Sequence, residues 1–134
     1  MAELSASSLS RLQGWGGAFL ALGAATGALG AHALEDVLTP ERLKSWSTAS
    51  LYLLVMGAGV VGAASARLTP NERKALGAVV AGTAVFSGSI FGLVALATAE
   101  AGDSVRAGLG PLTPLGGVAM IAGWAAFAWS RFRS

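Results

Sequence analysis

The chain has 134 residues, of which 54% are hydrophobic and 12% are charged, with a formal net charge of +2. Soluble domains carry about 25% charged residues, so this composition indicates a protein largely surrounded by lipid. The lack of cysteine excludes disulfides, thiolate metal sites and thiol nucleophiles. Basic residues at the ends of apolar runs, with so small a net charge, argue against a nucleic-acid partner. We therefore expect a single membrane domain over residues 1–134, without cofactor or metal.

The first expected helix covers residues 10–33, after a polar segment, residues 1–8, that we expect to fray or lie in the interface. Residues 12–31 form an uncharged run of 20 positions. A signal peptide is the alternative interpretation, because Ala31-His32-Ala33 resembles a cleavage site, but apolar regions of signal peptides are typically about 7–15 residues long. We interpret the run as a membrane span. Its expected packing face carries Gly23, Gly27 and Ala31 at four-residue spacing, with Gly30 beside it.

Two Thr-Pro pairs predict the starts of the next two helices. Thr39-Pro40 supplies an N-cap hydroxyl and a proline at the first helical position, ahead of an expected membrane helix at 42–66. Thr69-Pro70-Asn71-Glu72 has the spacing of a capping box, ahead of an expected helix at 72–99. Because only a few residues connect them, these two helices should be antiparallel neighbours.

The helix at 72–99 is the expected centre of the bundle. Residues 75–99 carry no charge in 25 positions, which is long enough to cross a bilayer. Ala84, Gly88 and Gly92 follow one another at four-residue spacing, which lets a neighbouring helix approach closely. We expect the other helices to pack around this one, and substitution of Gly88 by Leu to destabilise the bundle or its association.

The fourth expected helix covers residues 113–131 and follows a glycine-rich connection at 102–110. Thr113-Pro114 predicts its start, and Gly116-Gly117 predicts close packing near that start, with a broken helix as the less common alternative. The sequence therefore predicts an all-α fold, an integral membrane four-helix bundle.

Basic residues predict the orientation. Six lie at the expected chain-terminal end, namely Arg11, Arg67, Arg73, Lys74, Arg131 and Arg133. Three lie in the opposite connections, namely Arg42, Lys44 and Arg106. Because cytoplasmic loops carry the excess of Lys and Arg, we predict an N-in/C-in protein of the cytoplasmic (inner) membrane.

Four side chains are candidates for a ligand or polar site: His32, Tyr52, Ser87 and Ser89. His32 precedes two acids, which suggests a proton-sensitive group, but an ordinary interfacial residue explains it as well. Tyr52 and Ser89 lie at similar depth, and these residues and Ser87 are expected to hydrogen-bond between the second and third helices, or to act only as packing contacts. The spans lack internal charges, which argues against an ion-coupled transporter.

Three segments resemble a known family. They are Gly27-Ala28-Leu29-Gly30-Ala31-His32-Ala33-Leu34, Phe86-Ser87-Gly88-Ser89, and Thr113-Pro114-Leu115-Gly116-Gly117 with Ala122-Gly123-Trp124. Together they are similar to domain of unknown function 423, small bacterial inner-membrane proteins that are related to eukaryotic transmembrane protein 256. The resemblance implies four membrane helices and no agreed activity. The family's second helix typically carries Tyr-Gln-x-x-His, whereas here Leu53 and Met56 follow Tyr52, so a role for that histidine does not transfer.

Two classes of function remain after these arguments. The first is a non-enzymatic bundle that acts as an accessory or assembly subunit, or binds lipid, in a homo-oligomer or a larger membrane complex. The second is a small-solute channel or carrier with its polar site between the second and third helices. We do not expect an enzyme, since one interfacial histidine offers little for acid–base catalysis.

Overall fold

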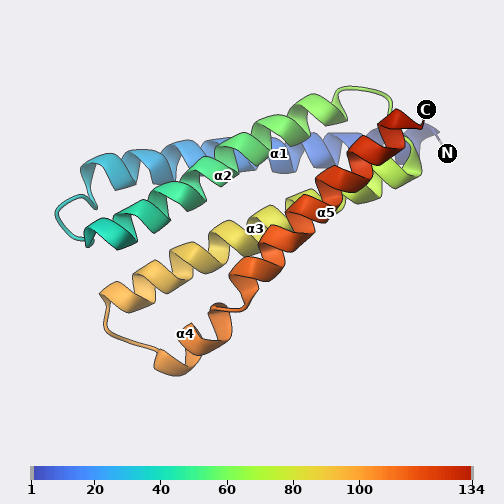
Figure 1. Ribbon diagram of the computed structural model, residues 1–134. Coiled ribbons are helices and arrows are strands. Elements are labelled where there is room, and N and C mark those ends of the chain that lie inside the picture. Colours follow the sequence, from blue (N-terminus) through green and yellow to red (C-terminus); the bar gives the residue numbers. More distant parts are fainter. Residues whose placement is uncertain (1, 134) are drawn as a thin grey trace.

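The computed structural model describes residues 2–133, with side chains from residue 7 onward, and every regular element in that range is a helix (Figure 1). The elements in chain order are α1 (Ala2–His32), α2 (Pro40–Ala64), α3 (Pro70–Thr98), α4 (Asp103–Leu109) and α5 (Leu112–Phe132). The predicted all-α membrane bundle is confirmed, with the four long helices close to their expected positions.

The N-terminal segment differs from the prediction. Residues 1–8 were expected to lie outside the helix, yet α1 begins at Ala2. Ala2, Glu3 and Leu4 have high helix propensity, so the segment extends the helix instead of fraying from it.

Two of the three predicted threonine caps are confirmed. The Thr39 hydroxyl accepts a hydrogen bond from the Arg42 backbone N–H at 3.4 Å, as an N-cap of α2 should. At the start of α3 the Thr69 hydroxyl accepts from the Glu72 N–H at 3.3 Å, and the Glu72 carboxylate accepts from the Thr69 N–H at 2.7 Å. Both halves of the capping box are therefore present.

The helix with the third predicted cap starts within one residue of its predicted position, but Thr113 is not its cap. The helix α5 begins at Leu112, with Pro111 at the cap position, and Thr113 lies inside its first turn. The Thr113 hydroxyl lies 2.7 Å from the Ser89 hydroxyl of α3 and so joins two helices instead of capping one. The expected connection at 102–110 also contains the short helix α4.

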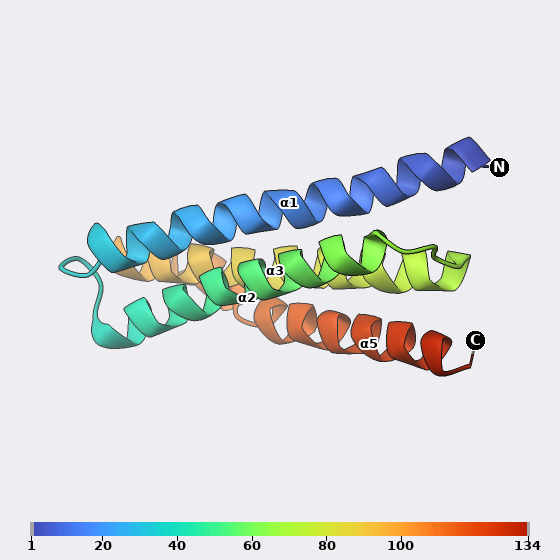
Figure 2. The ribbon, with the colours of Figure 1, turned by 90° about the horizontal axis from the view of Figure 1, so that it is seen from above.

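The helix α3 is the centre of the bundle, as predicted. It contacts each of the other four helices, and its most extensive contact is with α5. The helices α1 and α2 form a second extensively packed pair, which lies beside the first (Figures 1 and 2). The start of α1 and the end of α5 lie at the same end of the molecule (Figure 1). We call this the terminal end, and the end with the α1–α2 connection and α4 the loop end.

Glycines seven residues apart let α1 lie close to α2. Gly16, Gly23 and Gly30 are all buried on one face of α1. A methyl group added at Gly16 would lie 2.9 Å from the carbonyl oxygen of Gly57 in α2, and one at Gly23 would lie 3.0 Å from the backbone nitrogen of Leu54. A seven-residue period keeps one face of a helix turned toward its partner along a left-handed crossing.

The contact between α3 and α5 is equally close. A methyl group at Gly116 of α5 would lie 2.5 Å from the backbone nitrogen of Phe86, and one at Gly82 of α3 would lie 2.7 Å from the Gly116 carbonyl oxygen. Farther along α5, a methyl group at Gly123 would lie 2.7 Å from the carbonyl oxygen of Ala75. These backbones approach as closely as small residues allow.

The predicted ladder of Ala84, Gly88 and Gly92 is not the packing face of α3. Ala84 and Gly88 are exposed, and a methyl group at Gly88 would meet nothing within 4 Å. At Gly92 such a methyl group would meet only Leu109 of α4, at 3.3 Å. The prediction followed a four-residue ladder, whereas the buried glycine of α3, Gly82, belongs to another face. Gly27 of α1 likewise has open space around it.

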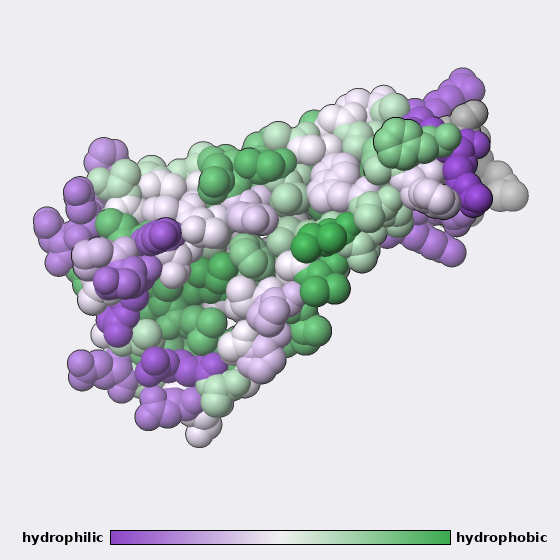
Figure 3. Space-filling view, viewed as in Figure 1, coloured by the Kyte–Doolittle hydropathy of each residue, from purple (hydrophilic) through white to green (hydrophobic). Residues whose placement is uncertain are grey.

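Three segments are long and apolar enough to cross a membrane: Pro40–Ala64, Pro70–Thr98 and Asp103–Phe132. The space-filling view has hydrophilic side chains gathered at both ends of the molecule and a mostly apolar middle (Figure 3). The helix α1 is not among the three, and its crossing stays a prediction, supported by its close packing along α2.

Candidate functional site

The four candidate polar residues do not form one site. The Ser87 hydroxyl donates a 3.0 Å hydrogen bond to the Ala49 carbonyl oxygen, from α3 to α2. The Ser89 hydroxyl faces the other way, with the Phe86 carbonyl at 2.9 Å and the Thr113 hydroxyl of α5 at 2.7 Å. Each serine therefore joins α3 to a different neighbour.

Tyr52 and His32 lie apart from the serines. The Tyr52 ring packs on the Phe86 ring, with the ring centroids 4.7 Å apart. His32 is exposed at the last residue of α1, and the hydrogen bonds and ring contacts found in the described chain do not connect it to the other three residues. These residues make separate contacts between helices, and they do not line one polar cavity between α2 and α3.

A cavity lies between α2 and α5, with α3 as its floor. The backbones of α2 and α5 both pack on α3 but do not approach each other. The cavity here measures about 520 Å³, with Tyr52, Phe86, Ile121 and Trp124 in its lining. The Trp124 indole N–H of α5 donates to the Met56 sulfur of α2 at 3.1 Å, so this side chain bridges the gap.

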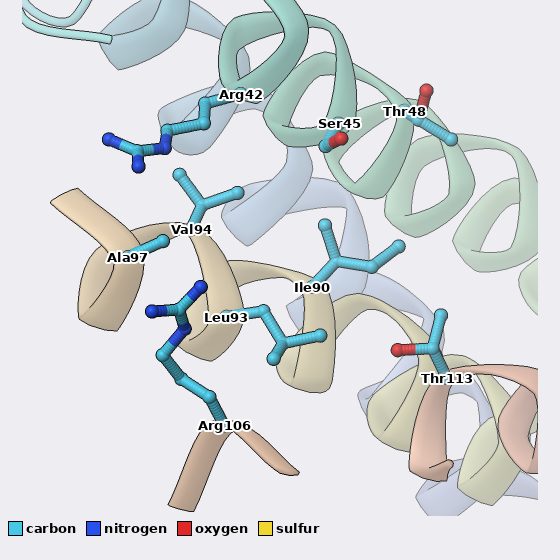
Figure 4. A pocket seen from close by; sticks show the side chains of 9 residues that line it. All are labelled: Arg42, Ser45, Thr48, Ile90, Leu93, Val94, Ala97, Arg106 and Thr113. Carbon is cyan, nitrogen blue, oxygen red and sulfur yellow. The ribbon is translucent and has the colours of Figure 1, made fainter. Parts of the chain in front are cut away.

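A second cavity, of about 440 Å³, continues along the same three helices toward the loop end. Its floor is the apolar face of α3 around Ile90, Val94 and Ala97, one to three turns beyond Phe86 (Figure 4). Arg42 of α2 and Arg106 of α4 reach into the space over Val94 and Ala97 from opposite sides (Figure 4). We call the two cavities together the α2–α5 groove.

The dimensions of the groove suit one leaflet of a bilayer. From Arg42 to Met56 the lining of α2 spans 14 residue steps, which is about 21 Å of helix at ~1.5 Å per residue. Half of a typical hydrocarbon core is about 15 Å thick. The groove therefore starts at the expected headgroup level and ends near the expected middle of the bilayer.

Arg42 and Arg106 are the charged side chains that line the loop-end cavity, although the connections at this end also carry five acidic residues. No ion pair of Arg42 is found among the described residues. Arg106 contacts Asp103 at 3.3 Å, but the Asp103 side chain is 96% exposed, and such surface pairs contribute only about 0–1 kcal/mol.

The terminal end carries a different ionic arrangement. The Arg131 guanidinium lies 2.9 Å from the carboxylate of Glu72, which is almost fully buried, and also donates to the Arg67 carbonyl at 3.0 Å. Glu72 lies ahead of the uncharged residues 75–99. Its hydrogen bond from the Thr69 backbone N–H, with a further contribution from Arg131, holds the pKa of the Glu72 carboxyl below its ordinary value despite burial. This pair ties the end of α5 to the start of α3.

The groove was not predicted from the sequence. Arg42 and Arg106 were used there only to predict the orientation of the protein in the membrane. One signal was present: Arg42, Ser45, Thr48 and Tyr52 follow one another at spacings of three and four residues, so they lie on one face of α2. The sequence could not show that this face meets Arg106, because α4 lies in a segment that was expected to be irregular.

Residues 26–117 match the family model described as a protein of unknown function, DUF423. A UPF0382 membrane protein of Schizosaccharomyces pombe is 40% identical over 100 residues, which cover 74% of this chain and 82% of the relative. A UPF0382 membrane protein of Staphylococcus epidermidis is 38% identical over 109 residues, which cover 80% of this chain and 81% of the relative. No solved structure matches. The family model covers most of the chain and its relatives are membrane proteins, so this chain is a membrane protein of the DUF423 family.

Proposed function

We propose that this protein is a non-enzymatic bundle that binds a membrane lipid from the side, in the α2–α5 groove. The observation that carries the proposal is the gap between α2 and α5, which has an apolar floor on α3 and aromatic walls at Tyr52 and Trp124. A groove of this lining buries an acyl chain without leaving a backbone polar group unpaired.

The channel or carrier hypothesis lacks such support. It requires Tyr52, Ser87 and Ser89 to line one polar cavity, yet the two serines bond to different helices and Tyr52 packs on Phe86. These residues are used for packing, so they are poorly placed to accompany a solute through the bundle.

Thermal unfolding of the delipidated protein in detergent tests the proposal. A ligand that binds only the folded state raises its Tm, so added phospholipid should stabilise the wild type. Ile121→Trp places a large ring at the groove and should reduce that rise. Leu115→Trp is the matched control, because Leu115 is exposed on the same helix but does not line the groove.

The control variant should keep the wild-type response to phospholipid. An equal response of both tryptophan variants, or no response of the wild type to any phospholipid, would exclude lipid binding in the groove.

A further inference from the structure

We infer that the groove selects a phospholipid with a net negative charge, whose headgroup lies between Arg42 and Arg106. This inference rests on the proposed function and adds the chemical class of the ligand. The two cavities of the groove follow one another along α3 and differ in lining: the one at the loop end has Arg42 and Arg106 at its edge, and the other is mostly apolar and includes Trp124. An amphiphile with an anionic head and a hydrocarbon tail matches both.

The two guanidinium groups suit a phosphodiester better than another partner. They approach the same space from α2 and from α4, on either side of Val94 and Ala97 (Figure 4). A guanidinium binds phosphate oxygens through two parallel N–H donors, so two of them hold one phosphate from two directions. The hydroxyls of Ser45 and Thr48 also line this cavity, but they donate to the Glu41 and Lys44 carbonyl oxygens of their own helix, so the two arginines are the donors that face the phosphate.

The apolar floor distinguishes a lipid from a free anion. Directly below the arginines the groove is lined by Ile90, Leu93 and Val94, and these side chains offer nothing to a soluble phosphate. A lipid tail that covers these side chains removes their apolar surface from contact with water at the entrance. The headgroup and the first part of the tail therefore bind together.

Native mass spectrometry of the full-length protein, incubated in detergent with equal amounts of phosphatidylglycerol and phosphatidylcholine, tests the inference. The wild type should retain more phosphatidylglycerol than phosphatidylcholine. The double variant Arg42→Gln, Arg106→Gln should lower the ratio of the two bound lipids about tenfold, since a hydrogen bond to a charged group typically contributes at least that factor. Total bound lipid should fall less than the ratio, because the tail site is intact.

Lys44→Gln is the matched control for charge. Lys44 lies in the same turn of α2 as Arg42 but does not line the groove, so this variant should keep the wild-type ratio. An excess of inorganic phosphate should leave the bound phosphatidylglycerol in place, because phosphate does not occupy the tail site.

The other outcomes would overturn the inference in distinguishable ways. Equal binding of both lipids by the wild type, with loss of both in Ile121→Trp, would reject the anionic headgroup and leave the lipid groove standing. A preference for phosphatidylglycerol that survives the double substitution would place the headgroup elsewhere, and displacement by phosphate would identify a soluble anion as the ligand. A wild type that retains no lipid, or that retains a protein in its place, would reject both proposals.

Discussion

At the scale of single residues, Glu72 combines two tasks in one carboxylate. It completes the capping box of α3, it pairs with Arg131 of α5, and it does so while almost fully buried. Its capping role was predicted from Thr69-Pro70-Asn71-Glu72. Its pairing was not, because nothing in the sequence specifies that the end of α5 reaches the start of α3.

Glu72→Gln separates the ion pair from the cap. Glutamine preserves the capping acceptor but removes the charge that faces Arg131, so we expect a lower Tm in detergent at neutral pH. Glu41→Gln is the matched control: Glu41 occupies the first turn of α2 and is exposed, and its replacement should leave the Tm near that of the wild type. A decrease of equal size in both variants would contradict a special role for the pair.

The same carboxylate predicts how stability depends on pH. The pKa of Glu72 is lowered in the folded protein, so its contribution is complete above the pKa of the unfolded chain and is lost as pH falls through the folded value. The difference in Tm between the wild type and Glu72→Gln should therefore shrink on acidification. A difference that stays constant down to strongly acidic pH would show that another interaction is responsible.

The hydroxyls show what sequence reasoning misses at this scale. Ser87 and Ser89 were expected to bond between the second and third helices, but only Ser87 does so, to a backbone carbonyl of α2. Ser89 bonds instead to Thr113, a residue predicted as a helix cap. The direction of a side chain depends on how each helix is rotated about its axis, and that rotation is set by packing of all the helices.

At the scale of elements, the close contact of α3 with α5 depends on Gly116. A methyl group there would collide with backbone atoms of Phe86, which have little freedom to move, so Gly116→Ala should cost about 1–3 kcal/mol by overpacking. Gly117→Ala is the matched control, because its nearest neighbours are ring atoms of Phe86 at 3.8 and 3.9 Å. Reversible unfolding in detergent measures the difference, and equal stability of the two variants would refute the contact.

The glycine pattern explains why the helices were predictable while their interfaces were less so. Long uncharged runs and Thr-Pro caps are local signals, and they located α2 and α3 to within about two residues. Interfaces depend on which of several small-residue ladders turns inward. Gly88 lies on a ladder that faces outward, so Gly88→Leu should be tolerated by the single chain, contrary to the expectation from sequence.

At the scale of the whole molecule, the orientation in the membrane is still a prediction. The basic residues predict that the loop end faces away from the cytoplasm. Because the natural chain has no cysteine, one introduced at Asp103 provides a unique label. An impermeant thiol reagent should modify it in intact cells, whereas a cysteine at the exposed Asn71, at the terminal end, should react only after lysis. The opposite labelling pattern would show that the protein has the opposite orientation in the membrane.

The groove is a property of the whole bundle that local patterns do not encode. It exists because α2 and α5 both pack on α3 without meeting, and because α4 brings Arg106 to the entrance opposite Arg42. Its lining comes from segments far apart in the chain, each unremarkable alone. The sequence predicted the membrane bundle and its central helix, whereas the groove required the arrangement of four helices in space.

Native mass spectrometry of the protein, extracted gently from its own membranes, tests the lipid-binding groove most directly. We predict that the wild type and Leu115→Trp each retain a lipid in fixed stoichiometry and that Ile121→Trp does not. A wild-type protein without bound lipid, or a lipid retained equally by both tryptophan variants, would contradict lipid binding in the groove.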